Sequence, residues 1–128
     1  MNRLFISGIF SIVLLDLFVK YAIEFFGWGI KPTSLSHFLI ISKTYNKGLL
    51  FGIAHSDDLL VNYSIIILMT LVIIALIFYV SKLLEASPNL SSLSKISWIL
   101  LLGGGIANYI DRLIDNKVTD YIILYYDE

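Results

Sequence analysis

The sequence contains, at residues 59–80, the run LLVNYSIIILMTLVIIALIFYV, which has 22 residues and no charged side chain. A helix of this length crosses a hydrocarbon layer of about 30 Å. Two further runs approach this length: residues 4–23, broken only by Asp16 and Lys20, and residues 96–114, uncharged until Asp111 and Arg112. Because a backbone in lipid must satisfy its own hydrogen bonds, the three runs predict three transmembrane helices.

The composition of the whole chain agrees with a membrane protein. Of its 128 residues, 58% are hydrophobic and 15% are charged, whereas a soluble domain is roughly 45–50% apolar and about 25% charged. Nine basic and ten acidic residues give a formal net charge of −1, which offers no electrostatic case for a nucleic-acid partner. The chain has no cysteine and two isolated histidines, so we expect no disulfide and no metal site built on cysteine or histidine.

Three spans fix which segments share a side of the membrane. We expect one membrane domain, 1–128, with segments 24–58 and 115–128 on one side and the N-terminus and loop 81–95 on the other. The distribution of lysine and arginine does not choose the orientation. A cleaved signal peptide over 4–23 is disfavoured, because the run is long, carries two charges and has no small-residue cleavage site. Residues 38–45 and 118–126 favour strands, so the predicted fold is an all-α polytopic protein with a small β-rich segment.

Charged residues inside the spans are the first candidates for function. Asp16 and Lys20 are four apart and share a helix face; they are either a neutralised pair that orients the helix or a brace for a site on the 24–58 side. In the third span, Asn108 and Asp111 share a face and Arg112 follows Asn108 by one turn. These three residues form either an internally paired network or part of an active site.

Two further candidates lie outside the spans. Asp120 is flanked by apolar residues at a predicted membrane boundary, where a poorly solvated carboxylate suits acid–base chemistry near neutral pH; the alternative is an ordinary turn residue. Asn46 and Gly48 form either a turn that directs backbone donors and an amide toward a peptide, or a common Asn/Gly turn without such a role.

The order of these residues along the chain is more specific than any one of them. The pattern consists of Asp16-x-x-x-Lys20, then Asn46-x-Gly48-x-x-Phe51-Gly52, then Gly103-Gly104-x-x-x-Asn108-x-x-Asp111-Arg112, and finally Val118-x-Asp120-Tyr121. It resembles the lipoprotein signal peptidase family, membrane aspartic proteases also called signal peptidase II, from about Leu4 to the last residue.

The resemblance implies a function and a set of site residues. It implies a bacterial endopeptidase that removes signal peptides from diacylglyceryl-modified prolipoproteins on the outer face of the cytoplasmic (inner) membrane, with no cofactor. Prolipoprotein and membrane lipid are the implied partners, and we expect a monomer. By the same resemblance Asp120 is the first catalytic aspartate; the supporting active-site residues are Asn46, Gly48, Asn108, Asp111 and Arg112, and the first-helix motif is Asp16 and Lys20.

One block of the family pattern does not occur in these residues. The family's second catalytic aspartate lies in a Phe-Asn-x-Ala-Asp block after the first, at the start of a fourth helix, and the sequence ends at Glu128 without it. We therefore expect a chain truncated relative to the family, in which the 128 residues alone have little or no peptidase activity. The alternatives are a non-catalytic protein that binds lipid-modified or apolar segments in the same groove, and a small channel or transporter component.

Overall fold

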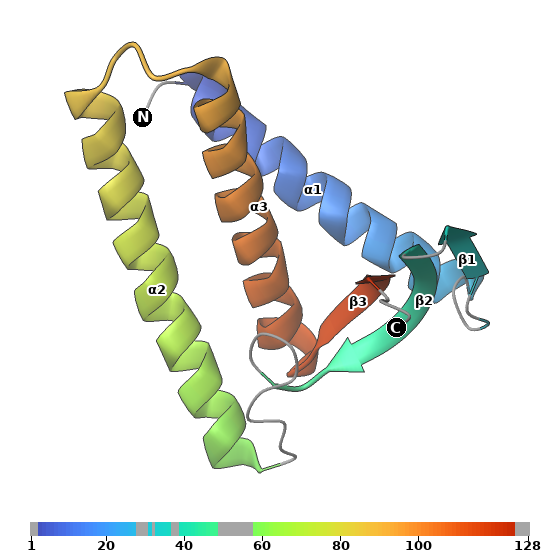
Figure 1. The fold of residues 1–128 in the computed structure, drawn as a ribbon. Coiled ribbons are helices and arrows are strands. Elements are labelled where there is room, and N and C mark those ends of the chain that lie inside the picture. Colours follow the sequence, from blue (N-terminus) through green and yellow to red (C-terminus); the bar gives the residue numbers. More distant parts are fainter. Residues whose placement is uncertain (1–2, 28–30, 32, 37–38, 49–57, 125–128) are drawn as a thin grey trace, which may run out of the picture.

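The computed structural model describes residues 3–27, 31, 33–36, 39–48 and 58–124. They form three long helices and a three-stranded sheet (Figure 1), in the order α1 (Arg3–Phe26), β1 (Thr33–Ser36), β2 (Leu39–Asn46), α2 (Leu59–Ala86), α3 (Ser92–Asp115) and β3 (Val118–Leu124). Each of the three helices is long and apolar enough to cross a membrane, and most of its surface is not covered by protein. The predicted fold class, three spans with a small sheet, is confirmed.

The helices extend further than the apolar runs. The second helix continues past residue 80 to Ala86, and the third begins at Ser92, so the predicted loop 81–95 is helical over most of its length. The helix-forming residues Lys82 and Glu85 extend the second helix and form an ion pair at 3.2 Å. The connection that remains is short, and the Ser91 side chain caps α3 by accepting a hydrogen bond from the Ser94 N–H at 3.1 Å.

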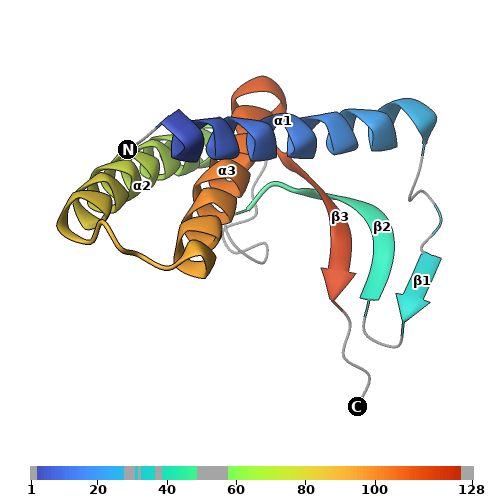
Figure 2. The same cartoon turned by 90° about the horizontal axis from the view of Figure 1, so that it is seen from above.

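The sheet forms at the end of the helices where α3 ends and α2 begins (Figure 1). Its order is β1–β2–β3 and both pairs are antiparallel. The two strands expected from composition are therefore present and paired with each other, while β1 is an additional strand. At Asn116 the backbone is left-handed (φ 54°), which ends α3 and turns the chain into β3. Figure 2 shows all three strands on one side of α1.

Helix α3 lies between the other two helices (Figure 1) and contacts both. Part of the core is a cluster of Phe5, Val80 and Leu102, one residue from each helix. Within the described part of the chain, only the first of the three consecutive glycines on α3 meets another helix: a Cβ at Gly103 would lie 2.6 Å from the Cβ of Ile12 and 3.2 Å from the carbonyl oxygen of Ile9 on α1. A Cβ at Gly104 would have no described atom within 4 Å. Gly103 thus sets the separation of α1 and α3.

This contact predicts a difference between two neighbouring substitutions. Gly103→Ala should destabilise the protein by about 1–3 kcal/mol, because the Ile12 Cβ cannot move without its backbone and the two helices must separate. Gly104→Ala adds the same methyl group in open space and should cost no stability. Thermal unfolding of both variants in detergent measures the difference. Equal midpoints for the two variants would contradict the proposed role of Gly103.

Candidate active site

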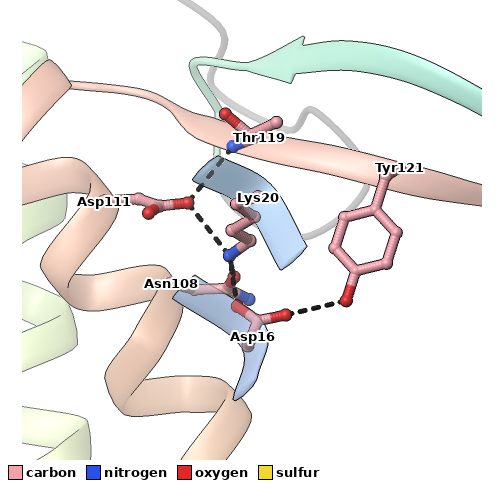
Figure 3. Close-up of polar contacts among 6 residues, drawn as sticks. All are labelled: Asp16, Lys20, Asn108, Asp111, Thr119 and Tyr121. Atoms are coloured by element: carbon pink, nitrogen blue, oxygen red, sulfur yellow. Dashed lines mark hydrogen bonds and ion pairs between the residues drawn. The ribbon is translucent and has the colours of Figure 1, made fainter. Parts of the chain in front are cut away.

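A buried lysine connects α1 and α3. Lys20 is 6% exposed, and its ammonium group lies 2.6 Å from Asp16, 2.9 Å from Asp111 and 2.7 Å from the Asn108 amide oxygen (Figure 3). The ammonium group donates a hydrogen bond to Asn108 and forms ion pairs with the two carboxylates. Burial of an ammonium group is costly unless it has polar partners, and these three residues provide them. The expected pair of Asp16 and Lys20 is confirmed and is part of a larger network.

The same network reaches the sheet on both sides of Asp120. The Tyr121 hydroxyl donates a hydrogen bond to Asp16 at 2.9 Å. The backbone N–H of Thr119 donates to Asp111 at 3.3 Å (Figure 3). Two carboxylates that are paired with Lys20 therefore also hold the residues that precede and follow Asp120 on β3.

Asp120 itself lies inside a strand. It is opposite Thr44 on β2, so its interpretation as a turn residue is wrong. Successive side chains of a strand point to opposite faces; the Asp120 carboxylate therefore faces away from the side on which Tyr121 contacts Asp16. Ile122, which shares the Asp120 face, is 58% exposed, so this face of β3 is open beyond Asp120.

Arg112 does not join the Lys20 network. Its side chain is buried, and its guanidinium donates to the carbonyl oxygens of Gly48 and, at 3.5 Å, of Lys47. Its Nε atom has no hydrogen-bond partner among the described residues. Arg112 therefore links the end of α3 to the residues that follow β2.

The contacts of Asp111 differ from those of the adjacent Arg112. The cationic partner of Asp111 is Lys20 and not Arg112, because consecutive residues on a helix do not face each other. Asn108 and Asp111 do share one face, as their spacing predicts, and both contact Lys20. The three polar side chains therefore do not form one cluster: Asn108 and Asp111 contact Lys20, whereas Arg112 contacts the carbonyl oxygen of Gly48.

The predicted turn after β2 is present. The Asn46 side-chain oxygen accepts a hydrogen bond from the Gly48 N–H at 2.9 Å, which is an Asx-type turn. The Gly48 carbonyl oxygen is bound by Arg112. The turn thus connects to α3 through Arg112. Phe51 and Gly52, which complete this motif in the sequence, lie outside the described residues.

Sequence reasoning missed a second cluster, which joins the sheet to the end of α1. Lys43 pairs with Glu24 at 2.5 Å, and the Tyr45 hydroxyl contacts both Glu24 oxygens at 3.0 and 3.1 Å. Lys117 lies 3.7 Å from the Tyr45 ring centre, a cation–π contact. The contact with Glu24 raises the pKa of Lys43. An acidic residue at the end of a span with basic residues in a predicted strand is the only sequence signal for this cluster.

The chain is similar to known proteins in sequence and in fold. A family model described as signal peptidase (SPase) II matches residues 8–128. Proteins named lipoprotein signal peptidase from Maridesulfovibrio salexigens, Bartonella bacilliformis and Pelodictyon phaeoclathratiforme are 29%, 32% and 31% identical to it. These matches cover 98%, 94% and 98% of this chain and 81%, 68% and 69% of the respective relatives. A solved bacterial membrane enzyme has the same fold, with a TM-score of 0.73 at 24% identity over 94% of this chain and 70% of that one.

Proposed function

The chain belongs to the signal peptidase II family, and we propose that it provides the first catalytic acid, Asp120, of a membrane aspartic endopeptidase. The proposed substrate is a diacylglyceryl-modified prolipoprotein, cut just before its lipid-bearing cysteine. The relatives named lipoprotein signal peptidase support this substrate class. The three membrane-length helices support it as well, because a lipid-modified cysteine lies at a membrane surface.

The observation that carries the proposal is the setting of Asp120. Its two neighbours on β3 are held by Asp111 and Asp16, and its own side chain lies on the strand face that is covered at Val118 and exposed at Ile122. A reacting carboxylate must be held in a fixed position and must be accessible to its substrate. We assign Arg112, Asn46 and Gly48 to the wall beside it, and Asn108 and the Lys20 network to its support.

The chemistry requires a second acid. In an aspartic protease two close carboxylates share a proton: one accepts a proton from the attacking water while the other donates one to the peptide carbonyl oxygen. One carboxylate cannot hold both protonation states at once. The Phe-Asn-x-Ala-Asp block that would provide the second acid does not follow Asp120 in residues 121–128, so we propose that a polypeptide of these 128 residues does not cleave.

The orientation follows from the same proposal. The N-terminus and the connection between α2 and α3 lie in the cytoplasm of a bacterial cell, and the sheet lies on the outer face of the inner membrane. In this arrangement Asp120 meets prolipoproteins after their lipid modification. The enzyme works as a monomer surrounded by membrane lipid.

A cleavage assay tests the function. The purified 128-residue chain, and the product of the same gene read past codon 128, are each mixed with a diacylglyceryl-modified prolipoprotein in detergent, and release of the signal peptide is followed by mass. We expect cleavage only by a product that includes the Phe-Asn-x-Ala-Asp block, and only of the lipid-modified substrate. The matched substrate control is the same prolipoprotein with serine in place of the lipid-bearing cysteine.

Each contrary result has a definite meaning. Cleavage by the 128-residue chain would contradict the requirement for a second acid after Asp120. Failure of a product with both acids to cleave, while it still binds the lipid-modified substrate, would contradict the enzyme and favour a non-catalytic protein that binds lipid-modified segments.

A further inference from the structure

Tyr121 follows the proposed catalytic acid and makes an unusual contact for a strand residue. Its hydroxyl group reaches across to α1 and donates to Asp16 at 2.9 Å (Figure 3). Burial and this hydrogen bond raise the pKa of Tyr121 to about 12. The hydroxyl therefore keeps its proton, and remains a donor, across the neutral pH range.

The partner of Tyr121 is itself rigidly held. Asp16 pairs with Lys20 at 2.6 Å, Lys20 pairs with Asp111 at 2.9 Å, and Asp111 accepts the Thr119 N–H at 3.3 Å. The contacts form a closed path: β3 at residue 121, then α1, then α3, and then β3 again at residue 119. The only residue of β3 between the two anchor points is Asp120.

From this path we propose that Tyr121 is a positioning residue, which fixes the orientation of the Asp120 carboxylate through its hydrogen bond to Asp16. The proposal rests on the function proposed above only for its effect on catalysis; the effect on the mobility of Asp120 is independent of that function. β3 pairs with β2 on both sides of this point, but the register is irregular opposite Tyr121: Asp120 pairs with Thr44, whereas Ile122 pairs with Ile41. The hydrogen bond to Asp16 holds Tyr121 where the pairing with β2 is interrupted. It therefore limits movement of the carboxylate one residue earlier.

Tyr121→Phe is the direct test, because it removes one oxygen atom and leaves the ring. The chain offers a matched control in Tyr109→Phe. The Tyr109 hydroxyl is also partly buried and also forms a hydrogen bond between two elements, to Thr70 of α2 at 2.8 Å, but it has no described contact with the Lys20 network. Both variants lose the same chemical group, so a general loss of stability should appear in both.

The first readout does not need cleavage. Backbone relaxation dispersion of the 128-residue chain in detergent micelles reports exchange on the microsecond to millisecond timescale. We expect Tyr121→Phe to raise the exchange contribution at residues 119–121, while Tyr109→Phe leaves these residues as in the parent chain. Unchanged dispersion at residue 120 in Tyr121→Phe would overturn the proposal, whatever the protein does as an enzyme.

The second readout uses the catalytically complete protein. Displacement of a catalytic group by about 1 Å can cost up to about 100-fold in rate, so we expect Tyr121→Phe to lower kcat about tenfold. KM and the thermal midpoint should change no more than in Tyr109→Phe. In an Asp16→Ala background the same substitution should change kcat less than twofold, because the contact is already absent. A full tenfold loss in that background would show that Tyr121 acts by another route.

The two readouts separate the two proposals. If no form of the protein cleaves, the proposed function fails, and the dispersion result still decides the role of Tyr121. If Asp120 is required for cleavage and Tyr121→Phe has neither effect, the positioning role fails and the proposed function stands.

Discussion

Replacing Asp120 with asparagine should abolish cleavage of lipid-modified prolipoprotein by the catalytically complete enzyme, lowering kcat by about 1,000-fold or more. An amide cannot accept a proton from the attacking water, and it cannot share a proton with a second carboxylate. Asparagine has nearly the same shape, and the Asp120 side chain has no hydrogen bond to the described residues, so the strand should remain in place. Cleavage rates and circular dichroism of the purified variant measure both effects.

Asp115→Asn is the matched control for this experiment. Asp115 is an exposed aspartate at the end of α3, five residues before Asp120, and no described contact ties it to the Lys20 network. Its replacement removes the same charge from the same end of the molecule and should leave kcat within about twofold, as for a surface change without a named structural role. If Asp120→Asn retains full activity, or if both variants lose it equally, Asp120 is not the catalytic acid.

Much of the fold could be predicted from the sequence because membrane spans have a strong local signal. An uncharged run such as residues 59–80 defines a helix without reference to the rest of the chain. The helix ends were less predictable, since Lys82 and Glu85 leave the apolar run but continue the helix. Strand β1 (Thr33–Ser36) has little strand-favouring composition, and it is defined by its pairing with β2, which no local pattern reveals.

The candidate site was predictable within each element and unpredictable between elements. Helical spacing correctly grouped Asp16 with Lys20, and Asn108 with Asp111. Lys20 contacts residues of both pairs only because α1 and α3 lie close together. The distance between these two helices is set at Gly103. The hydrogen bond from Tyr121 to Asp16 likewise joins residues 105 positions apart, and no spacing rule relates them.

The Lys20 network leads to the second large effect. Lys20→Met should destabilise the protein by about 3–5 kcal/mol, the range for removing one partner of a buried ion pair. Methionine fills a similar volume but leaves the Asp16 and Asp111 carboxylates, which are 20% and 14% exposed, close together without a cation. The repulsion between the two carboxylates then opposes the close approach of α1 and α3. Unfolding in detergent as a function of denaturant measures the loss.

A matched control and a charge-neutral variant show whether the buried charge is the cause. Lys82→Met makes the same substitution at an exposed pair, in which both side chains are 63% exposed, and should cost less than about 1 kcal/mol. The triple variant Lys20→Met, Asp16→Asn, Asp111→Asn has no buried charge to leave unpaired, and should recover most of the lost stability. If the triple variant is no more stable than Lys20→Met alone, the loss comes from side-chain packing, and the network does not stabilise the fold through its charges.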